Sequence, residues 1–161
     1  RVEKGNIMAR SRMIILYHEA AVHKGLVIGT GDRSEILIGY FTKYGDGGAD
    51  LFPIGGLYKT MVRQLAKHFG IPERICTKPA SPALWPGQTA EGEIGIDYNT
   101  LDAILYLRFE KGLREKRIEK TLGLPPEIIR KVMERIRMNQ HKRRMPKIFT
   151  VDYRRMIKRN V

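Results

Sequence analysis

The alternation of helical and extended patterns over the first 40 residues is the feature that most constrains the fold. Residues 6–23 place apolar side chains at helical spacing and stop before Gly25, which predicts one amphipathic helix. The apolar run 26–29 is typical of a buried parallel strand. Asp32 then stands at an N-cap position, and Glu35 completes the spacing of a capping box. This helix–strand–loop–helix order predicts α/β layering with a parallel sheet.

The rest of the chain divides into a loop-rich middle and a helical end. Residues 78–96 form a long connection that contains Pro79, Pro82, Pro86 and Gly87, and such connections are usually functional or mobile. Further helices are predicted at 58–69, 97–111, 114–122 and 127–144. We expect a single domain over residues 1–161, with an α/β part at 1–77, a mobile loop at 78–96 and a helical, basic part at 97–161.

Positive charge is concentrated in the last third of the chain. The net charge is +13, and residues 108–161 hold 18 Lys or Arg against 6 Asp or Glu, which accounts for +12. Such a basic block favours phosphate-bearing partners, although a solvated helix face explains it as well. Residues 114–137 also resemble a helix-turn-helix, so a nucleic-acid-binding module is one alternative. The second helix begins with apolar and acidic residues where base-reading side chains should stand, which favours a helical hairpin packed on a core.

The composition disfavours membrane-spanning and disulfide-linked proteins. No apolar run approaches the ~20 residues that cross a bilayer, and the polar first residues lack the apolar stretch of a signal peptide. Cys76 is the sole cysteine of the sequence, so an intrachain disulfide is impossible and a reducing cytoplasm fits. Cys76 is expected to fill the core rather than to act as a nucleophile.

Polar side chains next to the expected strand suit a nucleotide. Thr30 follows the run 26–29 directly, and ligands of α/β sheets bind where parallel strands end. Glu35 can hold a Mg²⁺ ion, which favours one or two carboxylates plus phosphate oxygens. On spacing alone, helix capping is the favoured explanation of Glu35. Lys59, near a helix start where a cation opposes the helix dipole, hints at a phosphate partner.

A glycine-rich loop at 43–50 and a basic segment near residue 141 are further candidates. Lys43 and Asp50 lie on flexible backbone that can clamp a ribose or a phosphate, though the same composition is common in surface turns. His141 and Lys142 fall at the end of the last helix, where cations either cap the helix C-terminus or contact a phosphate.

Together these pieces resemble the ammonia-dependent NAD synthetases of the ATP pyrophosphatase superfamily. The resemblance covers about residues 5–146 and depends on the order and spacing of several blocks rather than on one motif. The matching blocks include Gly-Asn-Ile-Met-Ala-Arg at 5–10, Val-Ile-Gly-Thr at 27–30, Gly-Tyr-Phe-Thr-Lys-Tyr-Gly-Asp-Gly-Gly-Ala-Asp at 39–50, Leu-Tyr-Lys-Thr at 57–60, Pro-Gly-Gln-Thr at 86–89 and His-Lys-Arg-Arg at 141–144.

The resemblance implies a Rossmann-like, adenine nucleotide alpha hydrolase-like sheet with flanking helices, and a C–N bond-forming ligase. In the family's reaction, ATP activates deamido-NAD as an adenylate with release of pyrophosphate, and ammonia then displaces AMP to give NAD. The resemblance further implies a cytoplasmic homodimer with Mg²⁺ and with ATP as co-substrate, and it argues against a nucleic-acid-binding role. A non-catalytic dimerisation module is the remaining alternative.

The resemblance also assigns roles to individual residues. It places Glu35 as the Mg²⁺ ligand and makes Asp50 and Lys59 catalytic, with Asp50 or Asp46 as the candidate acceptor for a proton from ammonium. The connection at 78–96 becomes a loop that closes over the reacting groups and excludes water. By position, the resemblance assigns deamido-NAD binding to Arg10, Lys43, Asp50, His141 and Lys142. It assigns ATP binding to Thr30, Lys59 and Ser81.

One departure from the family pattern concerns the leaving group. The ATP pyrophosphatases hold pyrophosphate in a Ser-Gly-Gly-x-Asp-Ser loop after their first strand, and no such run occurs in these 161 residues. The resemblance therefore implies that the first strands of the sheet and this loop are missing. The sequence is expected to be the C-terminal portion of a synthetase domain, inactive if these 161 residues are the whole protein.

Overall fold

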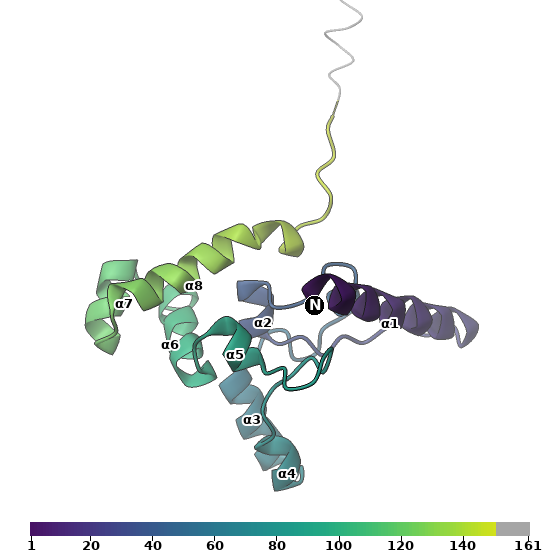
Figure 1. Cartoon of the computed structure of the whole chain (residues 1–161), viewed down its shortest axis with the longest axis horizontal. Helices are drawn as coiled ribbons and strands as arrows, with labels where there is room; N and C mark the ends of the chain where they lie inside the picture. The colour runs from purple at the N-terminus through teal and green to yellow at the C-terminus, as the bar shows by residue number, and fades with distance from the viewer. Residues whose placement is uncertain (151–161) are drawn as a thin grey trace, which may run out of the picture.

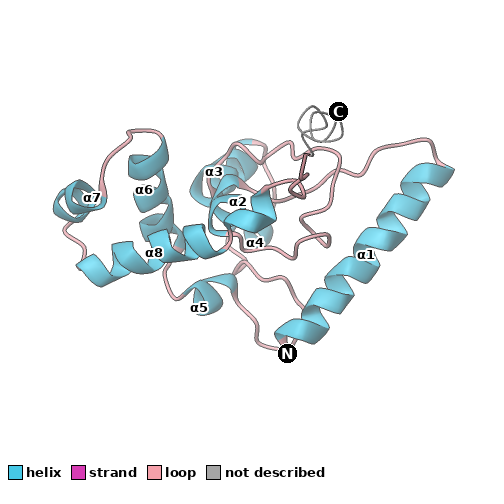
Figure 2. Ribbon diagram, turned by 90° about the horizontal axis from the view of Figure 1, so that it is seen from above, coloured by secondary structure: helices cyan, strands magenta, loops and turns pink. Residues whose placement is uncertain are grey.

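Helices joined by long loops make up the computed structural model, which describes residues 1–150 (Figure 1). Helix α1 lies to one side of a loop-rich region, and the group formed by α6, α7 and α8 lies on the other side (Figures 1 and 2). The elements are α1 (Val2–Val22), α2 (Arg33–Ile38), α3 (Lys59–His68), α4 (Glu73–Cys76), α5 (Ala90–Ile94), α6 (Tyr98–Phe109), α7 (Glu115–Leu122), α8 (Pro126–Met138) and the 3-10 helix η1 (Gln140–Arg143).

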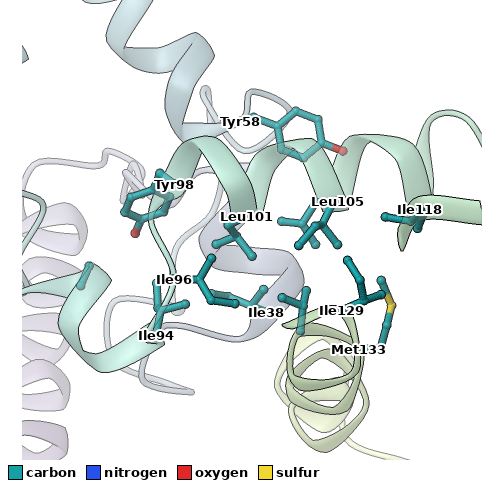
Figure 3. Packing of buried hydrophobic residues seen from close by; sticks show 13 residues of the cluster. Ile38, Tyr58, Ile94, Ile96, Tyr98, Leu101, Leu105, Ile118, Ile129 and Met133 are labelled. Carbon is teal, nitrogen blue, oxygen red and sulfur yellow. The ribbon is translucent and has the colours of Figure 1, made fainter. Parts of the chain in front are cut away.

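The hydrophobic core is centred on helix α6. Leu101 and Leu105 of α6 have no exposed surface, and they pack with Ile38 of α2, Ile118 of α7 and Ile129 of α8 (Figure 3). Full burial of an aliphatic side chain of this size contributes about 1.5–3 kcal/mol. The core therefore fixes α2 against the helical group, and this positions the N-terminus of α2 for the site described below.

Helices α7 and α8 form a hairpin that turns its apolar residues inward. Gly123 ends α7 in the left-handed conformation (φ 63°), and Pro126 begins α8 at the position that proline prefers. Ile118, Ile129 and Val132 are buried in the core. The interpretation as a helical hairpin packed on a core is confirmed, and the resemblance to a helix-turn-helix loses its support.

Two predicted helix starts and one predicted helix range are confirmed. Asp32 and Glu35 form a reciprocal capping box at the start of α2, and Asp97 caps α6. Helix α3 lies within the predicted range 58–69. Among the helices of residues 1–150, none combines the length and apolar character needed to span a bilayer.

The expected strand at 26–29 is wrong for the described part of the chain. The segment is extended and makes one isolated parallel bridge, from Ile28 to Leu51, and residues 1–150 contain no ladder of paired strands. Val27 is buried, but Leu26 and Ile28 are 67% and 61% exposed. An apolar run becomes a buried strand only when neighbouring strands pair with it and helices cover it, and the described residues supply one bridge.

The first helix is also not amphipathic in the expected sense. It runs from Val2 to Val22 rather than over 6–23, and its buried residues are the small Gly5 and Ala9. Ile14 and Ile15 remain about 60% exposed. Gly5 faces Leu84 and Trp85 of the 78–96 connection closely enough that a Cβ there would lie 3.0 Å from Leu84. Small residues, rather than an apolar stripe, bring this helix against its neighbours.

Short elements account for the remaining differences from the sequence prediction. The second half of the 78–96 connection forms α5, whose Ala90 and Ile94 lie in the core. The last helix ends at Met138 instead of residue 144, because the side chain of Asn139 donates to the carbonyls of Ile38 and Arg135 and the chain then tightens into η1. Residues 151–161 of the basic part expected at 97–161 lie outside the described residues.

Candidate functional site

Lys59 forms a compact ion cluster with two carboxylates at the start of helix α2. Its Nζ atom lies 2.6 Å from Oδ2 of Asp32 and 2.8 Å from Oε1 of Glu35. Asp32 is fully buried, whereas Glu35 and Lys59 are 20% and 17% exposed. The contact with Asp32 is an ion pair without hydrogen-bond alignment, since Oδ2 of Asp32 has no hydrogen-bond partner. A buried charge is costly unless it is paired, so both carboxylates depend on one ammonium.

Burial and charge set the protonation of this cluster. Burial raises the pKa of Glu35, the neighbouring charge of Asp32 adds to the rise, and Lys59 opposes it. Burial on its own would lower the pKa of Lys59, but the charges of Glu35 and Asp32 outweigh that effect and raise it. Lys59 therefore stays positive at neutral pH, and Glu35 takes up a proton at a higher pH than an ordinary glutamate.

A buried serine and a buried aspartate fix where helix α3 begins. Tyr58, the N-cap residue of α3, offers no capping side chain, so the first N–H groups of the helix need other acceptors. Oγ of Ser34 accepts from the N–H of Lys59 at 3.0 Å, and Oδ2 of Asp102 accepts from the N–H of Thr60 at 2.8 Å. Ser34 also donates to Oδ1 of Asp102 at 2.5 Å. The backbone at Lys59 is thereby tied to both α2 and α6.

The ring of Tyr98 supports two cations of helix α3. Nζ of Lys59 lies 5.3 Å from the ring centroid, and Cζ of Arg63 lies 5.6 Å from it. Tyr98 has no exposed surface, and its burial raises the pKa of the phenol, which stays neutral. A neutral aromatic face attracts cations without neutralising them.

The glycine-rich loop at 42–50 is docked on helix α1. Oγ1 of Thr42 donates to the Asn6 side chain at 2.7 Å, and the N–H of Thr42 donates to Oδ1 of Asp46 at 2.9 Å. A Cβ at Gly45 would lie 3.0 Å from Cβ of Ala9, so the missing side chain allows the close approach of the loop to the helix. The loop is held in a defined shape by these contacts.

Asp50, at the end of this loop, has its carboxylate fixed by two donors. Oδ2 accepts from the N–H of Val27 at 2.7 Å, and Oδ1 accepts from the hydroxyl of Tyr17 at 3.4 Å. At the other end of the loop, Nε of Arg10 donates to the carbonyl of Lys43 at 3.3 Å. Helix α1 and the segment after it therefore hold both ends of the loop.

The basic segment around η1 reaches back to the end of helix α2. Nζ of Lys142 donates to the carbonyls of Gly39 and Phe41 at 2.8 and 2.9 Å, and Arg143 donates to the carbonyl of Leu37. Burial lowers the pKa of Lys142, and the charge of Arg135 adds to this. His141 is exposed, and its carbonyl accepts from Nζ of Lys43 at 2.9 Å. These cations cap α2 and fix the entry to the 42–50 loop.

A cleft of about 1270 Å³ brings several of the predicted residues together. Its lining combines α1, the 27–31 and 39–48 loops, the N-terminal half of α3, residues 78–85 and the segment after α8. Of the predicted site residues, the cleft includes Thr30, Glu35, Lys43, Lys59, Ser81 and Lys142. Arg10, Asp50 and His141 do not line it; Arg10 and Asp50 hold the loop that does.

The donor set of the cleft suits a Mg²⁺ ion that arrives with phosphates. Residues 1–150 contain no group of three His, Cys, Asp or Glu side chains placed to hold a metal ion alone. Glu35 is a partly exposed carboxylate on the cleft wall, beside a lysine. One such carboxylate plus phosphate oxygens is a usual set of Mg²⁺ ligands. Glu35 is therefore compatible with the predicted role, in which a substrate would supply the remaining ligands.

Several residues that support the site were not predicted from the sequence. Asp102 stands between apolar neighbours in the core helix α6, and a carboxylate within such a stretch was the signal for a buried role. Ser34 and Asp102 lie 68 residues apart, so their pairing left no local pattern. Arg63 and Tyr98 also escaped notice, because a basic residue on a helix face and a tyrosine at a helix start are common.

Comparison with known proteins gives the chain its family. A sequence model of the NAD synthase family matches residues 1–146. The chain is 61% identical over 150 residues to an NH(3)-dependent NAD(+) synthetase of Saccharolobus solfataricus, and 54% identical over 154 residues to one of Sulfolobus acidocaldarius. These matches cover 93% and 96% of this chain and 54% and 55% of the relatives. The chain thus spans about half the length of the curated relatives it matches.

Solved structures agree with the sequence comparison. An NMN synthetase from Francisella tularensis superimposes with a TM-score of 0.76 at 34% identity, covering 94% of this chain and 57% of that one. An NH3-dependent NAD synthetase from Campylobacter jejuni superimposes with a TM-score of 0.71 at 34% identity, covering 92% and 56%. Since the family model matches most of the sequence and the fold matches as well, the chain belongs to the NAD synthase family.

Proposed function

We propose that the complete protein makes NAD from deamido-NAD, ATP and ammonia. Family membership supports this, as do the names of the relatives above 50% identity, which are NH(3)-dependent NAD(+) synthetases. The observation that carries the proposal is the Lys59 cluster: a cation and two carboxylates at a cleft that the 42–50 loop also lines. Joining a carboxylate to a triphosphate requires positive charge at such a place.

The proposed reaction has two steps. An oxygen of the nicotinate carboxylate attacks the α-phosphorus of ATP, the bond to the bridging oxygen breaks, and pyrophosphate leaves with the electron pair. Ammonia then attacks the carbonyl carbon of the adenylate, AMP leaves, and the nitrogen gives up a proton. A bound Mg²⁺ ion would offset phosphate charge during the first step. The residues of this chain bind and orient the substrates and receive the proton.

On the ATP side, we assign Glu35 as the Mg²⁺ ligand and Lys59 as a catalytic contact of the phosphates. Thr30 and Ser81 line the same cleft, where their hydroxyls can meet the nucleotide. Oγ of Ser81 accepts from the N–H of Ala83 at 3.1 Å, so it stays oriented while it keeps a proton to donate. Glu35 would hold the Mg²⁺ ion in place of its contact with Lys59, whose ammonium keeps its pair with Asp32 and could then also contact phosphate oxygens.

On the deamido-NAD side, we assign Arg10, Lys43, His141 and Lys142 to binding and Asp50 to binding and proton acceptance. Lys43 and Lys142 line the cleft, and Lys142 also fixes the loop by its two carbonyl contacts. The carboxylate of Asp50 is held by Val27 and Tyr17, which keeps a proton acceptor in one orientation.

We further propose the parallel, Rossmann-like sheet for the complete protein. The bridge between Ile28 and Leu51 is parallel, and the exposed apolar side chains beside it suit further strands. Residues 78–87 would be the mobile loop over the site, since Ala90, Ile94 and Ile96 anchor the following segment in the core. The exposed apolar residues of α1 suit a two-fold interface in a homodimer.

The test uses the complete natural protein with deamido-NAD, ATP and an ammonium salt. NAD, AMP and pyrophosphate should form in equal amounts, and glutamine in place of ammonium should give little product. Nicotinate mononucleotide is the comparison substrate, because one structural relative is an NMN synthetase. Glu35→Gln should cut the rate at limiting Mg²⁺. An unchanged rate would refute the metal assignment, and absence of NAD formation would refute the function.

A further inference from the structure

Arg63 lies one helical turn after Lys59 on the side of α3 that lines the cleft. Lys59, Val62, Arg63 and Ala66 all contribute to the cleft wall. The two cations stand over the same ring, at 5.3 and 5.6 Å from the centroid of Tyr98. Like charges four residues apart on a helix repel each other, so their shared position needs a reason.

Arg63 differs from the other half-buried cations of the cleft in having no oxygen partner. Among residues 1–150, its guanidinium takes part in no ion pair. The described side-chain hydrogen bonds also leave it without an acceptor. The others each contact a carboxylate or a carbonyl: Lys43, Lys59, Arg135, Lys142 and Arg143.

The acids of the cleft are already engaged and leave none for Arg63. Glu35 pairs with Lys59. Asp46 accepts from the N–H of Thr42, and Glu93 accepts from the side chains of Tyr40 and Gln88. A guanidinium has five donors in a planar fork, and partial burial without acceptors is unfavourable. The partner for this fork is therefore expected from a bound ligand that carries negative charge.

We propose that Arg63 binds the polyphosphate of the nucleotide, alongside Lys59. This rests on the proposed function and adds a residue to it. The planar fork of arginine matches two oxygens of a phosphate chain. During adenylation the bond between the α-phosphorus and its bridging oxygen breaks, and charge develops on the departing pyrophosphate. Arg63, one turn beyond Lys59, then holds the far end of the leaving group.

Two polyphosphates could meet Arg63, the triphosphate of ATP and the diphosphate of deamido-NAD. The neighbours of Arg63 favour the triphosphate of ATP. Lys59 on the same helix belongs to the Glu35 cluster, which we assign to ATP, whereas the 42–50 loop, which we assign to deamido-NAD, is fixed by α1 and η1. The two possibilities are distinguished by measuring the KM for ATP and the KM for deamido-NAD independently.

The experiment compares Arg63→Met and Arg63→Lys with the unmodified complete protein. Arg63→Met should raise the KM for ATP about tenfold or more, as expected for the loss of a charged hydrogen bond, with the KM for deamido-NAD nearly unchanged. Calorimetric titration with inorganic pyrophosphate should show the same loss of affinity, and Arg63→Lys a smaller one. Arg130→Met, on the exposed face of α8 and away from the cleft lining, is the matched charge control.

Folding is monitored separately, because Arg63 has no oxygen partner to lose and Arg63→Met removes only its contact with the Tyr98 ring. The melting temperature of ligand-free Arg63→Met should stay close to that of the control, while the rise produced by ATP should shrink. If the ATP KM and the pyrophosphate affinity stay unchanged in a variant that still makes NAD, the inference is wrong and the function stands. A rise confined to deamido-NAD would overturn it as well. Should the unmodified protein make no NAD, the function fails, and pyrophosphate titration of the variants still decides the role of Arg63.

Discussion

At the scale of single residues, Lys59 is the cation on which the carboxylates of Asp32 and Glu35 both depend for a counter-charge. Its ammonium serves a fully buried aspartate and a mostly buried glutamate at once. Removing one partner of a buried ion pair is far more destabilising than exchanging both, because the remaining charge stays unpaired. The three side chains therefore act as one unit.

Lys59→Met should lower the free energy of unfolding by about 3–5 kcal/mol. The same substitution in a Glu35→Gln background should cost less, with a coupling energy of about 0.5–3 kcal/mol, because one of the two stranded charges is already gone. Urea denaturation of the four proteins in this cycle measures the coupling. Strict additivity would contradict the shared dependence on Lys59.

Gly39 is a second residue whose identity is dictated by its surroundings. It ends α2 with φ at 68°, and a Cβ there would lie 2.2 Å from Cβ of Asn139. Gly70 has the same φ and nothing within 4 Å of its missing Cβ. The two glycines thus separate the cost of backbone conformation from the cost of a clash.

Gly70→Ala should destabilise by about 1–2 kcal/mol, the penalty of the left-handed conformation. Gly39→Ala should add about 1–3 kcal/mol for overpacking against Asn139, and it should also weaken deamido-NAD binding by displacing η1. Thermal unfolding and the KM for deamido-NAD are the measurements. Equal losses for the two substitutions would show that the Asn139 contact is not tight.

At the scale of elements, helix α6 begins at a cap made of one side chain. Oδ1 of Asp97 accepts from the N–H of Thr100 at 3.0 Å, and Oδ2 accepts from the hydroxyl of Thr100 at 2.7 Å. Both hydrogen bonds lower the pKa of Asp97, and the one from the hydroxyl of Thr100 has the larger effect. Helix α6 contains central residues of the core and Asp102, which accepts a hydrogen bond from the start of α3. Its cap therefore affects the site indirectly.

Asp97→Ala should destabilise the protein by about 1 kcal/mol near neutral pH. A carboxyl group whose pKa is lowered by folding stabilises the folded state above its unfolded pKa, and this contribution is lost as the pH falls through the folded value. The difference between the two proteins should therefore shrink below about pH 4. Unfolding measured from pH 7 to pH 2.5 checks this, and a difference that grows with acidity would contradict it.

The elements also show which features of the fold and the site could be predicted from the sequence. Asp32, Asp97 and Gly123 mark helix boundaries through contacts within a few residues, so they were readable in advance. The run 26–29 failed as a strand because strand formation depends on partners elsewhere. Glu35 and Lys59 were each found from local patterns, but their joint cluster with Asp32, and its support by Asp102, depend on distant pairings. Helix α5 and η1 are too short for a periodic signal.

At the scale of the whole molecule, the cations after α8 connect regions that are far apart in the sequence. Lys142 caps carbonyls 101 and 103 residues earlier, and Arg143 reaches one 106 residues earlier. The basic last third predicted as a phosphate-binding block thus also serves the protein's own backbone.

Lys142→Met should leave the carbonyls of Gly39 and Phe41 without this donor and cost about 1–3 kcal/mol of stability. Amide hydrogen exchange should speed up in residues 40–48 while remaining slow in α6. Lys147→Met, at an exposed position outside the cleft, is the control. Unchanged exchange in the loop would show that Lys142 does not hold it.

The long reach of η1 has a consequence for how the protein comes into being on the ribosome. Residues 37–41 are made some hundred amino acids before the side chains that cap their carbonyls. During that interval the carbonyls of Leu37, Gly39 and Phe41 lack the donors that Lys142 and Arg143 later supply, and closing so large a loop is slow. The cleft is therefore expected to form late in synthesis, and under the proposed function a nascent chain stalled before residue 142 should not yet retain nucleotide.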